Sequence, residues 1–558
     1  MSQVAASDIL TVPKPEQTKW SQFGTLITVF FFWGFVAASN GIFIPFCKTH
    51  FHLDQFESQL VDAAFYGAYF FGSLVLYILS TISGVDILNK IGYKAGIIYG
   101  LLISVIGAIG MAFISTSEAA TFGLVLVAFF TIALGFSLQQ TCAQPFAVAL
   151  GSPETGAHRL NLAGGINSIG TLLGPLVVSV VLFGGLADEG KQATLGNIKT
   201  LYIILAALFT AVAAFFAISK LPRVTSDEKI EKSPKALTTL IIISIPTFIL
   251  IFMNEWVVKH FGEAAKGYLI IITLFITVGS LFYGMAASRK NKAGWGAMQY
   301  PQLVLGMVAI FVYVGVEVTV QSNMGALLKT PDFGGLNEKF ISQYISLYWG
   351  SLMIGRLTAS ISVFDISKST KRVLTVVVPF ICFALILIVN VLRGTEVGNL
   401  YVYAVCIIFL IAAFFLANEK PVAMLLTVSV MATIAMLIGL FTAGDTARFA
   451  FISGGLFCSV MWPCIFSLAI AGLGKYTSQG SAFLIMMILG GAIIPPLQGA
   501  ICDIDKTNPE GIMNTTYTHF SYIVPVICFA YLAWHALKSK QVLRSQGIDF
   551  DQQISGGH

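Results

Sequence analysis

The chain has 558 residues, of which 56% are hydrophobic and 11% are charged, and its formal net charge is +5. An ordinary soluble domain carries about a quarter charged residues, so a soluble fold could not bury this much apolar surface. Apolar runs recur from residue 23 to residue 537, which predicts an all-α, polytopic membrane protein. The positive charge lies in short loops, so no nucleic-acid partner is expected.

Six apolar runs in the first part of the chain predict six membrane spans. The polar segment 1–22 precedes them, and the charged linker 220–236 follows them. The runs cover 23–45, 58–84, 95–115, two segments joined by a polar turn within 138–176, and 200–219.

Ten further runs follow the linker, which makes about sixteen candidate spans in all. They cover 237–253, 268–287, 300–328, 340–363, 373–393, 399–417, 421–442, 447–472, 480–502 and 514–537. The chain then ends in a basic tail, 538–558.

The distribution of Lys and Arg predicts the orientation of these spans. Short cytoplasmic loops of membrane proteins are rich in both residues. With the amino terminus inside, the basic groups of Lys90, Arg159, Arg372 and Lys475 all fall on the cytoplasmic side, and the alternate loops are poorer in basic residues. We therefore expect a protein of the cell inner (cytoplasmic) membrane with both termini in the cytoplasm.

Amides interrupt the stretch 138–176 at positions where a core helix would carry Leu or Val. Gln140 and Gln144 are four residues apart and share one helix face, and Gly164, Asn167 and Thr171 form a second stripe. A buried amide is costly without a partner. The two stripes either line a common aqueous cavity or hydrogen-bond helix to helix.

Two carboxylates lie within predicted spans. Asp62 opens the second span on a face with Tyr66, and Glu317 shares a stripe with Tyr313 and Gln321. An unpaired carboxylate in a cavity of low dielectric constant can take up a proton or ligate sodium. The alternatives are a salt bridge from Glu317 to an arginine such as Arg356, and a solvated position at the helix start for Asp62.

An internal repeat supports a chain built of two parts. Pro145 and Pro175 are separated by 30 residues across a polar turn, and Pro463 and Pro495 by 32. The segment F-Y-G-A-Y-F-F-G-S-L at 65–74 similarly matches L-Y-W-G-S-L-M-I-G-R-L at 347–357.

Several segments together resemble the major facilitator superfamily, and within it the branch of the fucose:proton symporter and the glucose/galactose permeases. The sharpest are S-N-G-I-F-I-P at 39–45, R-L-N-L-A-x-x-x-N-S-x-G at 159–170, Y-W-G-x-x-x-x-G-R at 348–356 and W-P-x-I-F-S-L at 462–468. The resemblance implies two six-helix bundles, 23–219 and 298–537, with a sugar site between them and alternating access by rocking. About four extra spans have no counterpart in the family's twelve: the pair at 237–287 and a pair inserted at 373–417. We expect them on the outside of the bundles, in contact with membrane lipid.

The chain departs from this family at two positions associated with proton coupling. The family's aspartate in the first span falls on Gly41, and its glutamate in the fourth span falls on Gln140. The family's asparagine is kept as Asn167. The coupling mechanism therefore cannot be carried over, and Glu317 and Asp62 become the candidates for the coupling ion.

The expected function is secondary active transport: cation-coupled uptake of a hexose or amino-hexose. Sugar hydroxyls need amide and carboxylate partners, and the apolar face of a sugar needs an aromatic platform. The expected partners are the small-molecule sugar and a coupling proton or sodium ion. The substrate-binding candidates are Asn40, Gln140, Gln144, Asn167, Gln321, Tyr313 and Trp349, with Trp33, Tyr66 and Trp462 as further aromatic candidates.

Two other functions fit the pattern less well. A cation-coupled exporter of small amphipathic compounds would need fewer amides, and a non-transporting sugar receptor would explain the missing coupling carboxylates. The spans carry no catalytic constellation and no ATP-binding motif, so neither an enzyme nor a primary pump is expected. The eight cysteines are scattered, and neither a metal nor a cofactor is expected.

Overall fold

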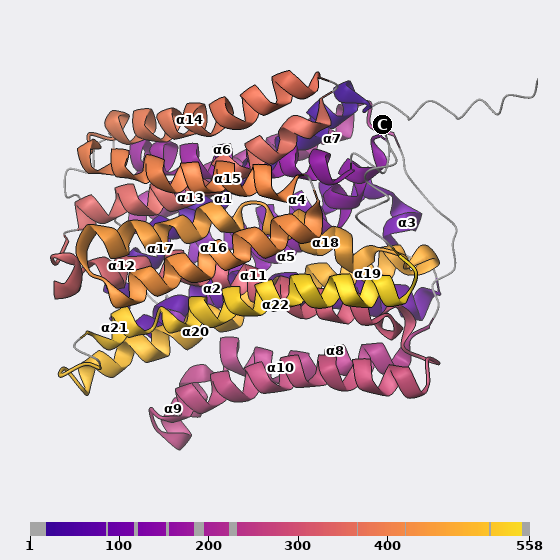
Figure 1. Ribbon diagram of the computed structural model, residues 1–558. Helices are drawn as coiled ribbons and strands as arrows, with labels where there is room; N and C mark the ends of the chain where they lie inside the picture. Colours follow the sequence, from indigo (N-terminus) through magenta and orange to yellow (C-terminus); the bar gives the residue numbers. More distant parts are fainter. Residues whose placement is uncertain are drawn as a thin grey trace, which may run out of the picture.

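The computed structural model describes most of the chain, and its long elements are all α-helices (Figure 1). The predicted all-α class is therefore confirmed. The terminal segments 1–22 and 538–558 lie partly outside the described residues. The described residues are 18–84, 87–115, 121–151, 156–183, 195–222, 232–336, 338–364, 366–418, 420–512 and 515–548.

The first half of the chain, residues 18–222, contains the helices that match the first six predicted spans. They are α1 (Trp20–His50), α2 (Gln55–Ser83), the short α3 (Ile87–Ile91), α4 (Tyr93–Ile114), α5 (Phe122–Ala149), α6 (Gly156–Phe183) and α7 (Leu195–Ile218).

A hairpin then leads into the second half, residues 296–548. The hairpin consists of α8 (Pro234–Phe252), α9 (Asn254–Phe261) and α10 (Ala265–Lys290). The second half contains α11 (Pro301–Ser322), α12 (Met324–Leu328), α13 (Glu338–Ser360), α14 (Lys368–Leu392), α15 (Ala404–Ala417), α16 (Pro421–Phe441), α17 (Gly444–Cys458), α18 (Met461–Ile470), α19 (Thr477–Met486), α20 (Gly490–Cys502), α21 (Tyr517–Phe520) and α22 (Ile523–Ser545). Short 3-10 turns join several of them, including η5 (Gly398–Tyr403), η6 (Gly474–Tyr476), η7 (Met487–Leu489) and η8 (Asp503–Lys506).

Thirteen segments of the described chain are long and apolar enough to cross a membrane. The other three predicted spans coincide with α1, α6 and α13, which are not among the thirteen. The total of about sixteen spans and their division into two bundles of six therefore remain predictions.

Several of the predicted continuous spans are interrupted, and two of them are broken near the middle. The run 447–472 is split into α17 and α18 by the residues Ser459 and Val460, and the run 480–502 is split by the turn η7. Pro463 has no N–H to donate to the carbonyl of Ser459 one turn earlier, and it lies in the first turn of the new helix, where such a bond is not needed. Hydropathy alone does not show such a break.

The long helices run between two ends of the molecule. The α21 end, at the left in Figure 1, carries α9, α12 and α21, and the α3 end, at the right, carries α3 and the start of α19. Helix α2 starts at the α21 end with a capping box, in which Asp54 accepts from the N–H of Glu57 and Glu57 accepts from the N–H of Asp54. It ends with Gly84 in the left-handed conformation, at φ 71°.

The two halves contact each other along two helix pairs. Helix α2 packs on α20, and α6 packs on α13. Within the first half, α1 packs so closely on α6 that a Cβ atom at Gly34 would overlap the carbonyl oxygen of Asn167. Such close approach of small residues is a common way for helices to associate without a hydrophobic driving force.

The extra helices lie at opposite edges of the molecule in Figure 1, with α8 and α10 along one edge and α14 along the other. Helix α8 contacts α2, and α10 contacts α20, so this hairpin touches both halves. The Lys266 ammonium of α10 lies 2.6 Å from the Asp54 carboxylate and 3.4 Å from that of Glu57, which attaches the hairpin to the start of α2.

Candidate functional site

A cavity of about 320 Å³ lies between the two halves of the chain. Its wall is built from α1, α2, α5 and α6 on one side and from α11, α13 and α18 on the other. Eight of the nine residues predicted for the site line it, and the side chain of the ninth, Asn40, lies outside the described residues. The eight are Asp62, Gln140, Gln144, Asn167, Tyr313, Glu317, Gln321 and Trp349.

The glutamines of α5 form a short hydrogen-bonded chain along the cavity wall. The Gln144 amide donates to the Gln140 oxygen at 3.2 Å, and the Gln140 amide donates to the Tyr69 hydroxyl at 3.1 Å. Within the described chain, the Gln144 Oε1 atom and the Oδ1 atom of Asn161 are buried and have no hydrogen-bond partner. Both acceptors therefore remain available to a donor inside the cavity.

The neighbouring amides hold helices together. The Trp33 indole N–H donates to Gln139 Oε1 at 2.8 Å, and Gln139 Nε2 donates to the Ser104 hydroxyl. Asn167 Nδ2 donates to the carbonyl of Phe30 at 2.9 Å, which ties α6 to α1. Both predicted uses of amides in this stretch thus occur: Gln140 and Gln144 line the cavity, Gln139 bonds helix to helix, and Asn167 does both.

Aromatic rings cover the apolar parts of the cavity. Trp33 and Tyr66 line it from the first half, and Tyr313 and Trp462 line it from the second. The ring centroids of Tyr313 and Trp462 are 6.2 Å apart. Helix α20 reaches the Tyr66 ring only because Gly491 has no side chain, since a Cβ atom there would lie 2.7 Å from the ring. The aromatic surfaces thus face the cavity from both halves.

Glu317 and Arg356 form an ion pair in the cavity wall. Arg356 Nη2 lies 3.1 Å from Glu317 Oε1, and the two side chains are 16% and 12% exposed. Arg356 Nη1 also donates to the Ser168 hydroxyl of α6 at 3.1 Å. The guanidinium therefore links α11, α13 and α6, and it connects the two halves.

Asp62 has a different environment. It is 5% exposed, it lines the cavity, and it has no hydrogen bond or ion pair in the described part of the chain. The interpretation of Asp62 as a solvated residue at the helix start is wrong, because the residue lies in the second turn of α2 and is buried. An ionised carboxylate buried without a cation is costly, and taking up a proton removes that cost.

The structure adds wall residues that were not predicted. Ser168 lies one residue after Asn167, and Ser342 and Ser346 lie near the start of α13. Arg393 also lines the cavity, although it follows α14, one of the helices expected outside a substrate path. Ser and Arg are too common in sequences to indicate a site by themselves. Only the arrangement of the helices in space shows that these residues share one wall.

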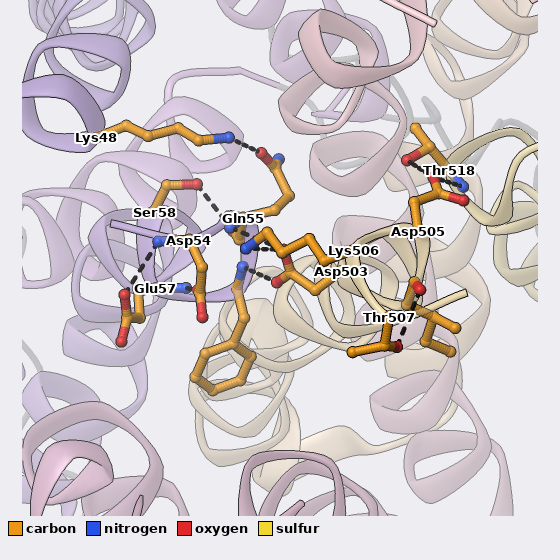
Figure 2. Close-up of polar contacts among 12 residues, drawn as sticks. Lys48, Asp54, Gln55, Glu57, Ser58, Asp503, Asp505, Lys506, Thr507 and Thr518 are labelled. Carbon is orange, nitrogen blue, oxygen red and sulfur yellow. Dashed lines mark hydrogen bonds and ion pairs between the residues drawn. The ribbon is translucent and has the colours of Figure 1, made fainter. Parts of the chain in front are cut away.

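Cross-half contacts close the α21 end beside the cavity (Figure 2). The Asp503 carboxylate accepts from the backbone N–H groups of Gln55 at 3.3 Å and Phe56 at 2.9 Å, at the start of α2. Lys506 neutralises the same carboxylate at 2.9 Å. An acidic side chain is favourable at a helix amino terminus because the first N–H groups lack partners within the helix.

The side chain of Gln55 extends this contact. Its oxygen accepts from Lys48 at 2.6 Å (Figure 2). Its amide donates to Asn323 Oδ1 of the second half at 3.1 Å. Burial lowers the pKa of the Lys48 ammonium, and the nearby Asp503 carboxylate opposes that shift. These contacts join α1, α2, α11 and the turn after α20.

The α3 end is closed by fewer polar contacts. Gln479 Nε2 donates to the Tyr77 hydroxyl at 3.2 Å, and the Tyr77 ring lies edge-on to Phe483 at 5.1 Å. Trp20 stacks on Phe364 with ring centroids 5.4 Å apart. Both ends of the cavity thus have contacts that must break if the halves are to move apart.

Comparisons with known proteins agree with this architecture. No family model matches the chain. It is 29% identical over 513 residues to a protein named glucose/galactose transporter from Brucella abortus, covering 92% of each chain. It is 24% identical over 523 residues to the L-fucose-proton symporter of Escherichia coli, covering 91% of this chain and 90% of that one.

The fold matches that of a solved transporter. The crystal structure of a major facilitator superfamily transporter, FucP, in the outward conformation aligns with a TM-score of 0.58 and 22% sequence identity, over 93% of this chain and 98% of that one. The resemblance predicted from the sequence is therefore confirmed. The chain is a multi-pass membrane protein with the fold of the major facilitator superfamily and is a homologue of bacterial proteins named as sugar transporters.

Proposed function

We propose that the chain is a secondary active sugar transporter, which takes up a hexose or amino-hexose across the cytoplasmic membrane by alternating access. The observation that carries this proposal is the cavity of about 320 Å³ between the halves. It is lined by two amide oxygens that have no partner among the described residues, by aromatic rings and by two carboxylates. A sugar ring combines hydroxyls with an apolar face, so this lining has the chemistry that recognises it. The names of the relatives support the same class of substrate.

We propose a proton as the coupling ion and Asp62 as its carrier. Glu317 already has the Arg356 guanidinium as its counter-charge, whereas Asp62 has no partner within the described residues. A sodium site needs several oxygen ligands around the cation. The described residues contain no group of three or more His, Cys, Asp or Glu side chains that could hold a metal ion, and one of the relatives is named a proton symporter.

Uptake of radiolabelled sugars tests the function. Cells that lack their own hexose carriers and express the chain should accumulate D-glucose, D-galactose, L-fucose or D-glucosamine, and a protonophore should abolish the accumulation while omission of sodium should not. If none of these sugars moves under any gradient, the sugar assignment fails. An exporter of amphipathic compounds or a sugar receptor would then explain the cavity better.

Gln144→Leu should weaken binding of the transported sugar about tenfold, which would be measured as a tenfold higher half-saturating concentration for uptake. The Gln144 Oε1 atom has no partner in the described chain, so its hydrogen bond to a sugar hydroxyl would be lost at about 1 to 2 kcal/mol. Gln299→Leu is the matched control, since among the described residues the Gln299 side chain bonds only the carbonyl of Gly296 and does not line the cavity. Equal effects of both variants would contradict the role of Gln144.

Alternating access requires the α21 end to open, which gives a prediction for Asp503. Asp503→Ala removes the acceptor for two N–H groups at the start of α2, and loss of such a cap costs about 1 kcal/mol. Hydrogen–deuterium exchange of the peptide containing residues 55–59 should therefore become about fivefold faster.

Asp505→Ala is the control for this experiment. Asp505 lies two residues away and accepts from the N–H group of Thr518 within the second half (Figure 2). It also accepts from the N–H group of Tyr517. Its loss should accelerate exchange at 517–520 and leave 55–59 unchanged. If Asp503→Ala leaves exchange at 55–59 unchanged, Asp503 does not hold the two halves together.

A further inference from the structure

A second cavity, of about 250 Å³, lies at the α21 end of the second half. Its polar and aromatic wall residues are Phe340, Gln343, Tyr344, Glu396, Asn399 and Arg448, which come from α13, η5 with the residues before it, and α17. The two cavities use different positions of α13: Ser342 and Ser346 line the central cavity, and Gln343 and Tyr344 line the second. The second cavity is therefore separate from the proposed transport path.

Gln343 is the feature of this cavity that most needs a partner. Its side chain is 4% exposed, and it makes no hydrogen bond in the described part of the chain. A buried amide oxygen without a hydrogen-bond partner is unfavourable, because it has lost its bonds to water and gained none in return. A helix in which Leu occupied this position would avoid that cost, so the amide indicates a polar group bound in the cavity.

Arg448 lines the same cavity as this amide and is held by several contacts. Its guanidinium donates to the Tyr344 hydroxyl at 2.8 Å, to Asp445 at 2.6 Å and to the carbonyl of Phe333 at 3.1 Å, and it lies over the Tyr344 ring at 4.8 Å. Its Nε atom has no partner among the described residues. The residues that line the cavity therefore include a buried donor, Arg448 Nε, and a buried acceptor, Gln343 Oε1, that have no partner among the described residues.

The charges of the wall disfavour an anion as the occupant. Asp445 already neutralises Arg448, and Glu396 adds a further negative charge. A hydroxyl can donate to Gln343 Oε1 and accept from Arg448 Nε, while Asn399 and Glu396 remain for neighbouring hydroxyls. Phe340, which is 40% exposed, supplies an apolar surface of the kind on which a sugar ring packs.

We propose that this second cavity is a sugar-binding site distinct from the central one, on the side that the sequence predicts to be extracellular. The sugar contacts the Gln343 amide and the exposed side chains of Asn399 and Glu396, and it lies against Phe340. This proposal goes beyond transport, because a site off the transport path binds sugar without moving it.

Equilibrium dialysis of the full-length protein in lipid nanodiscs against radiolabelled D-galactose and L-fucose counts the sites. We expect two sugars per chain in the wild type and one in Gln343→Leu. Asn399→Ala, which changes an exposed residue, should lower the affinity of the second site for sugar at least tenfold. This variant tests the proposal if Gln343→Leu does not fold. Glu510→Ala, an exposed change that lines neither cavity, should leave two sites.

Hydrogen–deuterium exchange locates the bound sugar. Sugar should slow exchange of the peptide 396–403 in the wild type and in Gln144→Leu, but not in Gln343→Leu or Asn399→Ala. Two results would overturn the second site. The first is one bound sugar per chain in the wild type and in both variants, and the second is protection of 396–403 by sugar that persists in both variants. Loss of uptake in Gln144→Leu bears only on the central cavity, so the two proposals fail separately.

Discussion

Replacing Asp62 with Asn is expected to abolish sugar accumulation and to leave sugar exchange intact. The amide has nearly the same shape as the carboxyl group but cannot carry a proton. Because Asp62 has no hydrogen bond or ion pair in the described chain, the substitution breaks no structural contact. The sugar-binding residues of α5 and α6 remain in place, so the variant should still bind sugar and carry it in both directions.

The size of the effect follows from the energy that one proton supplies. One elementary charge that moves through a membrane potential of about 100 mV provides about 2.3 kcal/mol. Each 1.4 kcal/mol corresponds to about a tenfold ratio, so one coupled proton sustains an accumulation of about 50-fold. Asp62→Asn should lower this ratio to about one.

The measurement compares net uptake with counterflow in cells or proteoliposomes that carry a proton gradient. Counterflow of labelled sugar against unlabelled sugar needs no coupling, and Asp62→Asn should retain it at nearly the rate of the wild type. Glu255→Gln, on the exposed surface of α9, is the matched control and should accumulate normally. Normal accumulation by Asp62→Asn would exclude this residue as the proton carrier.

Periodicity in the sequence predicted the wall of the central cavity well. Residues four apart on one helix share a face, and for this reason Gln140 with Gln144, and Tyr313 with Glu317 and Gln321, all reach the same space. Amides, carboxylates and aromatic residues are also rare enough in apolar runs to stand out. Polar residues within membrane spans are therefore informative about a cavity even when one chain is read alone.

The pairing of these side chains could not be predicted to the same degree. The sequence offered a salt bridge to Arg356 as one alternative for Glu317 but did not decide between that pair and an unpaired carboxylate, and the structure shows the pair. Adjacent glutamines also differ, because a rotation of about 100° per residue points Gln139 at Trp33 and Gln140 at Tyr69. Such differences depend on how neighbouring helices are rotated and packed.

The contacts of the extra helices with the two halves likewise could not be predicted from the sequence. Their scarcity of polar residues indicated lipid contact, and α8 and α10 do lie at one edge of the molecule (Figure 1). The same hairpin, however, binds the start of α2 through Lys266 and also packs on α20. A single lysine near a helix end gives no sign of its partner, which lies more than 200 residues earlier in the chain.

Arg356→Ala is expected to reduce the sugar uptake rate by about tenfold to a hundredfold. The substitution removes the hydrogen bonds to Glu317 and Ser168, and bonds to charged groups contribute about 1.5 to 3 kcal/mol. It also leaves the Glu317 carboxylate, which is 12% exposed, without a counter-charge in the cavity wall. The purified Arg356→Ala variant should also unfold at a lower midpoint temperature than the wild type. Arg289→Ala, at the exposed end of α10, is the control and should change neither the uptake rate nor the unfolding midpoint.

The double variant Glu317→Gln with Arg356→Gln separates a structural ion pair from a coupling group. Removing one partner of a buried pair leaves an uncompensated charge, whereas replacing both removes the charges together, so the double variant should be more stable than Arg356→Ala. If Glu317 only neutralises Arg356, the double variant should accumulate sugar against its gradient, at a reduced rate. If it exchanges sugar but cannot accumulate it, as expected for Asp62→Asn, then Glu317 takes part in coupling and Asp62 is not the sole carrier of the proton.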